Sequence, residues 1–217
     1  EVHGYFLPAT YAGGDLFDLV MLKEKLFLLL GDATGHGFGP ALSATQMQAM
    51  LRVAFRCGAD LDEAYRQVNN QLAEDLPADR FITAFMGFLD PLTHELCYHS
   101  AGQGPILHYH AADNRFEWYQ PTTFPVGILE VEAVGPVASL LLEPGDIIAL
   151  ISDGLYEYVN RDRELFGETR VAEILEQDQH LSMSALCHRL VEAAEVFGAG
   201  AAQADDITLV LLKRLLL

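Results

Sequence analysis

The sequence predicts an α+β domain in which antiparallel sheets are covered by helices on their outer faces. The segments run in the order strands, two helices, many strands, two helices and one strand, which differs from the strand–helix alternation of a parallel sheet. The chain has 217 residues, of which 51% are hydrophobic, and this is enough for a sizeable core. We find no break that separates two domains and therefore expect one domain over residues 1–217.

Three short apolar segments with strand character open the chain. The second and third flank the pair Lys23-Glu24, which predicts a hairpin. The three predicted strands are Val2–Leu7, Leu16–Leu22 and Lys25–Leu30.

Two helices are expected next. Pro40 stands at a suitable first helical position, and the residues after it are rich in Ala, Leu, Met and Gln. Asp60 is a suitable N-cap for the second helix, with Glu63 at the capping-box position. The predicted helices are Ala41–Phe55 and Leu61–Leu76.

Strand patterns then return, separated by turn signals such as Asp90-Pro91 and Asp113-Asn114. They predict the strands Phe81–Leu89, Glu95–Ser100, Pro105–His110 and Arg115–Tyr119, followed by a loop over Phe124–Glu132.

The last third of the sequence contains a turn signal at Pro144-Gly145-Asp146, which predicts that the strands on either side of it pair with each other. Two helices and a closing strand follow. The predicted elements are the strands Ala138–Leu142 and Ile147–Ser152, the helices Glu168–Gln177 and Ser182–Phe197, and the strand Ile207–Leu212.

The formal net charge of −18 argues against two classes of partner. Nucleic acids and anionic membrane surfaces are both bound through Lys and Arg, so we expect neither. No apolar run approaches the roughly 18 residues that cross a bilayer. The three cysteines form no C-x-x-C pair, and we expect buried, reduced thiols in a cytoplasmic protein. Because the chain begins at Glu1 without Met, we expect an excised domain with an upstream region.

Aspartates stand at the ends of the strongest predicted strands. Asp32 follows an apolar run and precedes a glycine-rich loop, and Asp153 follows another apolar run and precedes glycine. Asp205 and Asp206 come directly before the last strand. If that strand is antiparallel to the other two, these carboxylates meet at one edge of the sheet core.

Two more aspartates belong to the same pattern. Asp15 follows Gly13-Gly14 at the start of a strand, and Asp18 comes three residues later. Any one Asp-Gly step is a common turn signal, but the whole set adjoins strong strands.

Several carboxylates cannot all stay ionised at one apolar edge, because like charges and burial both raise their pKa values. A bound divalent cation removes this penalty, and oxygen ligands suit Mg²⁺ or Mn²⁺. The neighbouring glycines would let the backbone approach such an ion. We therefore expect a cation at this edge.

Five motifs in order resemble those of a known family. They are A-G-G-D-L-F-D (Ala12–Asp18), G-D-A-T-G-H-G (Gly31–Gly37), A-G-Q-G-P (Ala101–Pro105), S-D-G-L-Y-E (Ser152–Glu157) and D-D-I-T-L-V (Asp205–Val210). The chain resembles the SpoIIE-type branch of the metal-dependent PPM (type 2C) protein serine/threonine phosphatases over essentially its whole length. This resemblance implies a four-layer αββα sandwich of two antiparallel sheets flanked by helix pairs.

The resemblance also implies a site for two Mn²⁺ or Mg²⁺ ions. By resemblance, Asp32 bridges both ions with the Ala33 carbonyl nearby, Asp15 binds the second ion, and Asp153 and Asp205 bind the first. The remaining aspartates have lesser roles, Asp206 as a second-ranked ligand and Asp18 in the outer shell. The implied reaction is attack on phosphorus by a hydroxide that bridges the ions.

The chain departs from the family pattern at some points. The third motif commonly reads Ala-Gly-His, and Gln103 takes the place of that histidine, so no histidine role is expected there. The branch lacks the amino-terminal Arg and Glu of animal relatives, which leaves phosphate orientation to the metals and backbone donors. His36 could protonate a leaving serine oxygen, but we favour a loop histidine bonded to the backbone. We interpret the other strand histidines as surface or packing residues, namely His94, His99, His108 and His110.

In this branch the domain often follows a receiver or sensor domain in a bacterial response regulator. The implied partners are that amino-terminal domain and a phosphorylated anti-sigma-factor antagonist or similar regulatory protein. The alternative is a weakly active or non-catalytic adaptor on the same fold, although the complete carboxylate set favours an enzyme. An ATP-binding kinase of the Asp-x-Gly-x-Gly type fits poorly, because the spacing after Asp32 is wrong.

Overall fold

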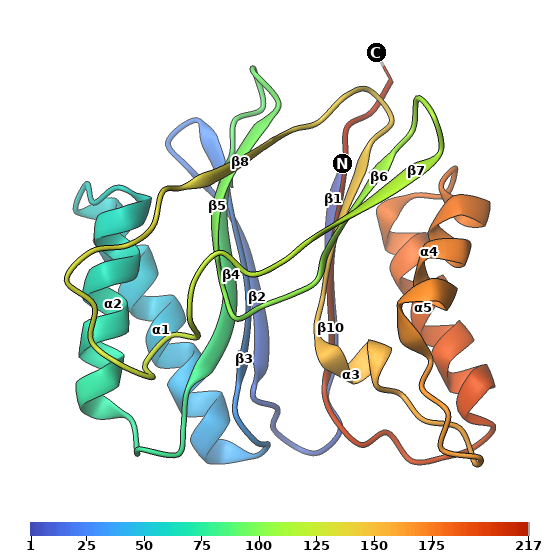
Figure 1. The fold of residues 1–217 in the computed structure, drawn as a ribbon, viewed down its shortest axis with the longest axis horizontal. Coiled ribbons are helices and arrows are strands. Elements are labelled where there is room, and N and C mark those ends of the chain that lie inside the picture. The colour runs from blue at the N-terminus through green and yellow to red at the C-terminus, as the bar shows by residue number, and fades with distance from the viewer. Residues whose placement is uncertain (217) are drawn as a thin grey trace.

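The computed structural model describes residues 1–216 as four layers, helices–sheet–sheet–helices (Figure 1). Sheet A has the strand order β1 (Val2–Leu7), β10 (Ile207–Lys213), β9 (Ile147–Ile151), β6 (Ile106–His110) and β7 (Arg115–Tyr119). Sheet B has the order β2 (Asp15–Leu22), β3 (Lys25–Ala33), β4 (Ile82–Leu89), β5 (Glu95–Ala101) and β8 (Ala138–Leu141). All named strand pairs are antiparallel.

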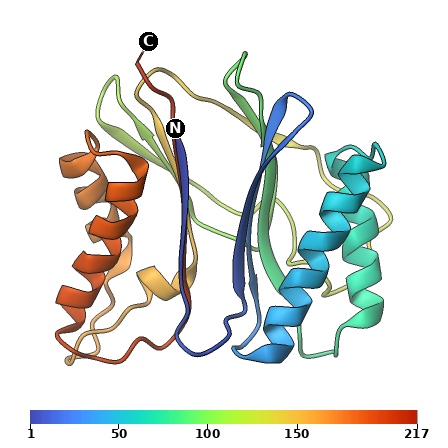
Figure 2. The ribbon, with the colours of Figure 1, turned by 180° about the vertical axis from the view of Figure 1, so that it is seen from behind.

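Helix pairs cover the outer face of each sheet, as the view from behind also shows (Figure 2). Helices α1 (Phe38–Arg56) and α2 (Leu61–Asp75) pack on sheet B, and α4 (Gly167–Asp178) and α5 (Met183–Gly198) pack on sheet A. The short helix α3 (Asp153–Tyr156) follows β9 directly. This arrangement confirms the predicted αββα sandwich.

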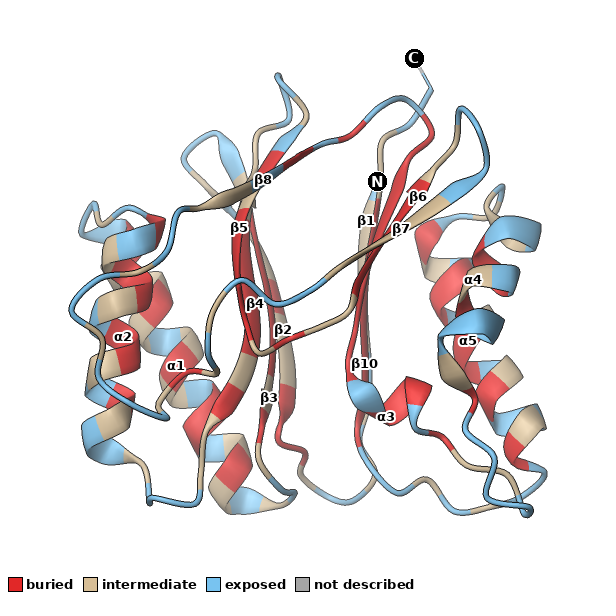
Figure 3. Cartoon of the chain, viewed as in Figure 1, coloured by how far each residue is buried: buried red, intermediate tan, exposed pale blue. Residues whose placement is uncertain are grey.

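Strand alternation distributes the apolar side chains over three core regions, one under each helix pair and one between the sheets. Figure 3 shows that the buried residues are concentrated in the strands and recur along the helices. In β3, Phe27 and Leu29 pack under the helices, whereas Leu28 and Leu30 pack between the sheets. In β9, Ile148 and Leu150 also face the space between the sheets. A polar residue that shares a strand face with these inner positions therefore also lies between the sheets.

Side-chain caps mark the starts of two of the predicted helices, α2 and α5. The Asp60 carboxylate accepts a hydrogen bond from the Glu63 amide at 2.9 Å, which caps α2 as expected. Ser182 caps α5 through a 3.2 Å bond from Ala185 N. Helix α1 begins at Phe38, so Pro40 lies within its first turn and not at the first helical position.

Most predicted elements are present with ends displaced by a few residues, but one predicted pairing is wrong. The segments 138–142 and 147–152 do not form a hairpin, because β8 pairs with β5 of sheet B and β9 pairs with β10 and β6 of sheet A. The chain instead crosses from one sheet to the other after β8 (Figure 1). Helix α3 was not predicted.

Two further sequence expectations concern burial and membranes. Cys187 is buried as expected, but Cys57 is exposed and Cys97 is half-buried, so that expectation is wrong for two of the thiols. Within residues 1–216, no helix combines the length and apolar character needed to cross a membrane.

Candidate metal centre

Asp15 and Asp32 begin the candidate site because they are direct partners across neighbouring strands. Asp15 opens β2 and pairs in antiparallel register with Asp32 near the end of β3. Asp32 shares the inner face of β3 with Leu28 and Leu30, which pack in the core between the sheets. Two carboxylates therefore face sheet A from adjacent positions of sheet B.

Sheet A supplies a hydrogen-bond donor to this pair. Thr208, on the inner face of β10, donates from Oγ1 to Asp15 Oδ2 at 2.6 Å. Ser152, which follows β9, accepts at Oγ from Thr208 N at 2.9 Å and so belongs to the same network. Asp15, Ser152 and Thr208 are all buried. The site thus lies between the two sheets at the end of the sandwich where β3 ends and β10 begins.

The pKa values of both carboxyl groups are raised. Burial raises the pKa of Asp15 to about 9, and the negative charge of Asp32 adds to this, while the hydrogen bonds from Thr208 and Ser152 oppose it. Burial also raises the pKa of Asp32 to about 6, with further contributions from the negative charges of Asp153, Asp205 and Asp206. Without a cation, the pair therefore retains a proton at neutral pH.

Asp153 and Asp205 bring further negative charge from the sheet A side. Asp153 is the first residue of α3, immediately after β9 and Ser152, and Asp205 lies just before β10. The Asp153 residue is exposed at its surface side. The surrounding protein still removes part of the water around the carboxylate, which raises its pKa, and the negative charge of Asp205 raises the pKa further. The two residues are therefore near neighbours at the rim of the site.

Asp206 differs from its neighbour because its carboxylate is buried and already has donors. It accepts hydrogen bonds from Ala9 N at 2.8 Å and from Asp15 N at 3.4 Å. Its own amide donates to Asp205 Oδ1 at 2.8 Å. Asp206 thus holds the loop before β2 against β10, which positions Asp15.

Two glycines are required by close backbone approach around these carboxylates. A Cβ atom at Gly154 would lie 1.9 Å from the Asp206 carbonyl oxygen, and one at Gly14 would lie 2.4 Å from the Ala33 carbonyl oxygen. Any larger residue would push the β2 and β3 ends, or α3 and β10, apart. The Ala33 carbonyl, at the end of β3, therefore lies directly beside Gly14, the residue that precedes Asp15.

Asp18 and His94 lie elsewhere than expected, whereas His36 lies in a loop as expected. Asp18 is not in the outer shell of the cluster, because a separation of three residues places it on the opposite face of β2 from Asp15, where both of its oxygens bond Arg52 of α1. His36 lies exposed in the loop between β3 and α1. Of the four strand histidines, His94 lies in the turn before β5 and not on a strand.

Gln103 is a functional candidate that sequence reasoning undervalued. Its side chain is buried and bridges the sheets, because Nε2 donates to Ile151 O at 3.0 Å and Oε1 accepts from Thr83 Oγ1 at 3.1 Å. Thr83 is the cross-strand partner of Asp32 on β4. The glutamine thus fixes the spacing between the sheets beside the carboxylates.

The donor set fits a hard divalent cation. Asp15, Asp32, Asp153 and Asp205 offer oxygen atoms, and the Ala33 carbonyl offers another nearby, which is the ligand chemistry of Mg²⁺ and Mn²⁺. The raised pKa values of Asp15 and Asp32 reveal uncompensated negative charge that a cation would neutralise. With such ions bound, the site would present positive charge to an anionic ligand.

A second group of possible ligands lies apart from these carboxylates. His108, His110 and Asp146 place one ligand atom each within 4.8 Å of one another. The interpretation of His108 and His110 as surface or packing residues therefore missed this grouping. Their spacing of two residues on one strand was the available signal, because it places both on the same face.

A family model described as "Stage II sporulation protein E (SpoIIE)" matches residues 23–215 of the chain. Among curated proteins, the chain is 26% identical over 157 residues to the phosphoserine phosphatase RsbU of Bacillus subtilis. That match covers 72% of this chain but only 47% of the relative, so the chain spans about half the length of that protein.

Solved structures share the whole fold. The RsbU and RsbW domains of a Mycobacterium tuberculosis protein match with a TM-score of 0.80 and 29% identity, covering 99% of this chain and 60% of that one. The PP2C domain of SiaA from Pseudomonas aeruginosa matches with a TM-score of 0.83 and 18% identity, covering 98% of this chain and 85% of that one. The second likeness shows the fold alone.

Proposed function

The chain belongs to the SpoIIE family, and from this membership we propose that it is a metal-dependent protein phosphatase that hydrolyses phosphoserine or phosphothreonine. The observation that carries the proposal is the pairing of Asp15 with Asp32 between the sheets, with Asp153 and Asp205 at the rim. The phosphoserine phosphatase named among its relatives supports the reaction class.

Asp32, Asp15, Asp153 and Asp205 would hold two Mn²⁺ or Mg²⁺ ions, with the Ala33 carbonyl as a further ligand. When bound, such ions supply positive charge to the phosphoryl oxygens and lower the pKa of coordinated water. Asp206 has a different role in this proposal, because its carboxylate is committed to the amides of Ala9 and Asp15. It positions Asp15 and the loop before it.

The protein's own groups prepare the site in three ways. Thr208 orients the Asp15 carboxylate through its hydroxyl donor. Gln103 holds sheet A and sheet B at a fixed separation beside Asp32. Asp15 keeps a proton on its carboxyl group in the metal-free protein and releases it when cations arrive, which couples metal affinity to pH.

The substrate proposed here is a phosphorylated serine on a small regulatory protein, such as an anti-sigma-factor antagonist. The solved relative that joins an RsbU to an RsbW domain supports a role in such regulatory systems. We extend the proposal to the domain organisation, in which residues 1–217 form one phosphatase domain that works behind an amino-terminal receiver or sensor domain. The bound cations also offset the repulsion between the −18 chain and an anionic substrate.

The test is hydrolysis of p-nitrophenyl phosphate and of a phosphoserine peptide by the purified 217-residue chain, with and without Mn²⁺. We expect turnover that depends on Mn²⁺ and that falls at least about 100-fold in Asp153→Ala. Asp113→Ala is the matched control, because Asp113 is exposed in the turn between β6 and β7. Equal turnover in Asp153→Ala and wild type would contradict the proposal, and metal binding without any hydrolysis would favour the adaptor alternative.

A further inference from the structure

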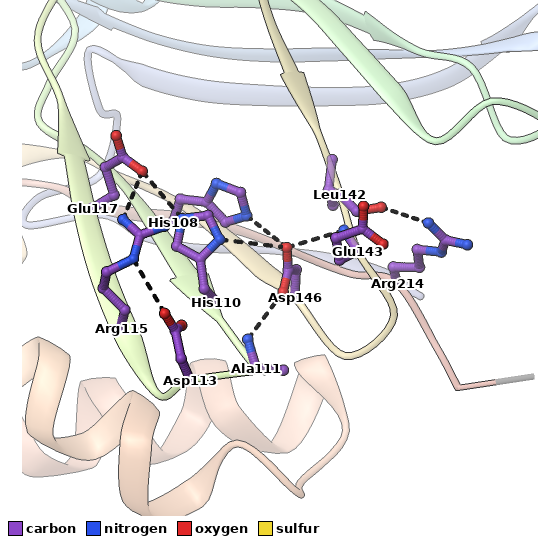
Figure 4. Close-up of polar contacts among 10 residues, drawn as sticks. All are labelled: His108, His110, Ala111, Asp113, Arg115, Glu117, Leu142, Glu143, Asp146 and Arg214. Atoms are coloured by element: carbon purple, nitrogen blue, oxygen red, sulfur yellow. Dashed lines mark hydrogen bonds and ion pairs between the residues drawn. The ribbon is translucent and has the colours of Figure 1, made fainter.

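The two histidines of β6 and the aspartate before β9 form a compact cluster (Figure 4). The cluster lies at the opposite end of β9 from Asp153 and the acidic site. His108 and His110 are two residues apart on β6 and share its inner face with Ile106, which packs between the sheets. Asp146 immediately precedes β9, whose Ile148 is the register partner of His108. Asp146 and Asp153 lie at opposite ends of β9, about 20 Å apart at the rise of a strand.

The spacing of the three ligand atoms matches the size of a tetrahedral metal ion. His108 Nε2 lies 3.0 Å from Asp146 Oδ2, and His110 Nδ1 lies 3.8 Å from the same oxygen. Bonds of about 2.0–2.1 Å in a tetrahedral site place neighbouring ligands about 3.3–3.4 Å apart. The two distances to Asp146 Oδ2 lie on either side of this value, and all three ligand atoms lie within 4.8 Å of one another, so side-chain adjustments would bring them onto one ion.

The carboxylate of the cluster is held in place from both sides. Asp146 Oδ1 accepts from Ala111 N at 2.9 Å, and Oδ2 accepts from Glu143 N at 3.0 Å. Asp146 is buried, so these backbone donors fix its direction toward the histidines. Because the Asp146 carboxylate is already oriented in the absence of an ion, less conformational entropy is lost when an ion binds.

The histidine nearest solvent also has an orienting partner. His110 Nε2 lies 3.2 Å from Glu117 Oε2 on β7, which leaves Nδ1 directed toward Asp146. Arg115 in turn donates to Glu117 at 2.9 Å, and this bond, with those from Tyr119 and His110, lowers the pKa of Glu117 to about 2. A carboxylate on the far nitrogen of a ligating histidine is the usual support of protein metal sites.

The buried His108 ring faces Asp146 through its Nε2 atom. The residue is buried, and burial lowers the pKa of its imidazole despite the nearby Asp146. Within residues 1–216, its Nδ1 is buried without a hydrogen-bond partner. A cation bound at Nε2 takes the place of the hydrogen bond to Asp146, and the neutral ring then carries its one proton on Nδ1.

We propose that His108, His110 and Asp146 form a second metal site, specific for a borderline transition-metal ion of the Zn²⁺ class and separate from the acidic centre. Two imidazoles and one carboxylate are ligands that Zn²⁺, Co²⁺ and Ni²⁺ accept readily, whereas Mg²⁺ prefers oxygen atoms alone. His110 is 20% exposed, which gives an ion access and leaves the fourth position for water. The ion would tie β6 to the crossover that enters β9.

The experiment uses the full chain carrying both Asp15→Asn and Asp32→Asn, because this double variant lacks the two central carboxylates of the acidic site. Zn²⁺ binding is measured by calorimetry, and the thermal midpoint Tm is measured with and without Zn²⁺. We expect one saturable site and a rise in Tm of about 5–10 °C at a hundredfold excess over Kd. The absence of saturable Zn²⁺ binding in this background would overturn the proposal.

Variants of the cluster assign the binding to its residues. His110→Gln is the main variant because the side chain is partly exposed and the substitution is tolerable in the fold, and we expect at least a hundredfold loss of affinity. Glu117→Gln should weaken binding about tenfold by removing support for His110. His188→Gln is the control, since His188 is exposed on α5. Zn²⁺ affinity unchanged by His110→Gln would overturn the assignment.

Discussion

Asp15 and Asp32 are directly opposed residues on antiparallel strands, and both carry raised pKa values because the surrounding protein desolvates the two neighbouring carboxyl groups. Like charges at such positions destabilise a sheet pair. The fold therefore holds an electrostatic cost at this point that a bound cation would relieve.

Replacing Asp15 with Asn should stabilise the metal-free protein while removing Mn²⁺-dependent turnover. The amide is isosteric and neutral, and its oxygen can still accept from Thr208 Oγ1. We expect the free energy of unfolding at pH 8 in EDTA to rise by roughly 1–3 kcal/mol. Urea denaturation checks this, and a less stable Asp15→Asn protein would contradict the cost assigned to burying the Asp15 carboxyl group beside Asp32.

The stability of the metal-free protein should fall as pH rises. The ordinary pKa of Asp15 is 3.8 and its value in the folded protein is about 9, so between these values the folded state binds a proton that the unfolded state has released. Stability gained from this proton is complete below pH 4 and is lost toward pH 9. Asp32 adds a smaller loss between about pH 4 and pH 6.

The measurement for this pH dependence is the urea midpoint in EDTA at pH 5.5 and pH 8.5. Wild type should lose more stability over this interval than Asp15→Asn, in which the main titrating group is absent. Saturating Mn²⁺ should reverse the trend, because the ions bind the deprotonated carboxylates. Equal slopes for wild type and Asp15→Asn would show that Asp15 does not titrate as described.

Gln103→Leu should destabilise the protein by about 2–4 kcal/mol. The change leaves the Ile151 carbonyl and the Thr83 hydroxyl without the partners they have across the sheets. Gln103→His should retain more stability, because an imidazole can still donate to Ile151 O. Thermal unfolding of both variants tests whether the hydrogen bonds of Gln103 matter. If the side chain only filled space, Gln103→Leu would be the better tolerated substitution.

Arg52→Ala should lower stability by about 1–3 kcal/mol without changing the Mn²⁺ dependence of turnover. Arg52 is partly exposed, but it pairs with the buried Asp18, which the change would leave without its partner. The pair lies on the helix-facing side of β2, away from Asp15. A large shift in the Mn²⁺ concentration needed for half-maximal activity would place Asp18 in the metal site after all.

The sequence was sufficient to predict the strands and helices because their signals are local. Period-two patterns, caps and turn residues specified elements such as β2, β3 and α2. The predicted pairing of β8 with β9 failed because Pro144-Gly145-Asp146 marks a reversal but does not select a partner, and β5 and β10 compete for these strands. Helix α3 was missed because its four residues read as an Asp-Gly turn.

The sequence was sufficient to predict the carboxylates of the candidate site, but not the residues that position them. Asp32, Asp153 and Asp205 adjoin apolar runs of the sequence, so their place at strand ends could be predicted without knowledge of the fold. The roles of Thr208 and Gln103 depend on how the two sheets face each other. The histidine cluster likewise required β6 to lie beside β9, because Asp146 is remote from His108 in the sequence.

The most direct test of the central claim is calorimetric titration of the purified chain with Mn²⁺, in wild type and in Asp32→Ala. If the carboxylates of both sheets hold a pair of hard cations, wild type binds two ions and releases protons, and Asp32→Ala loses both sites. Retention of two Mn²⁺ ions by Asp32→Ala, with unchanged affinity, would contradict the account.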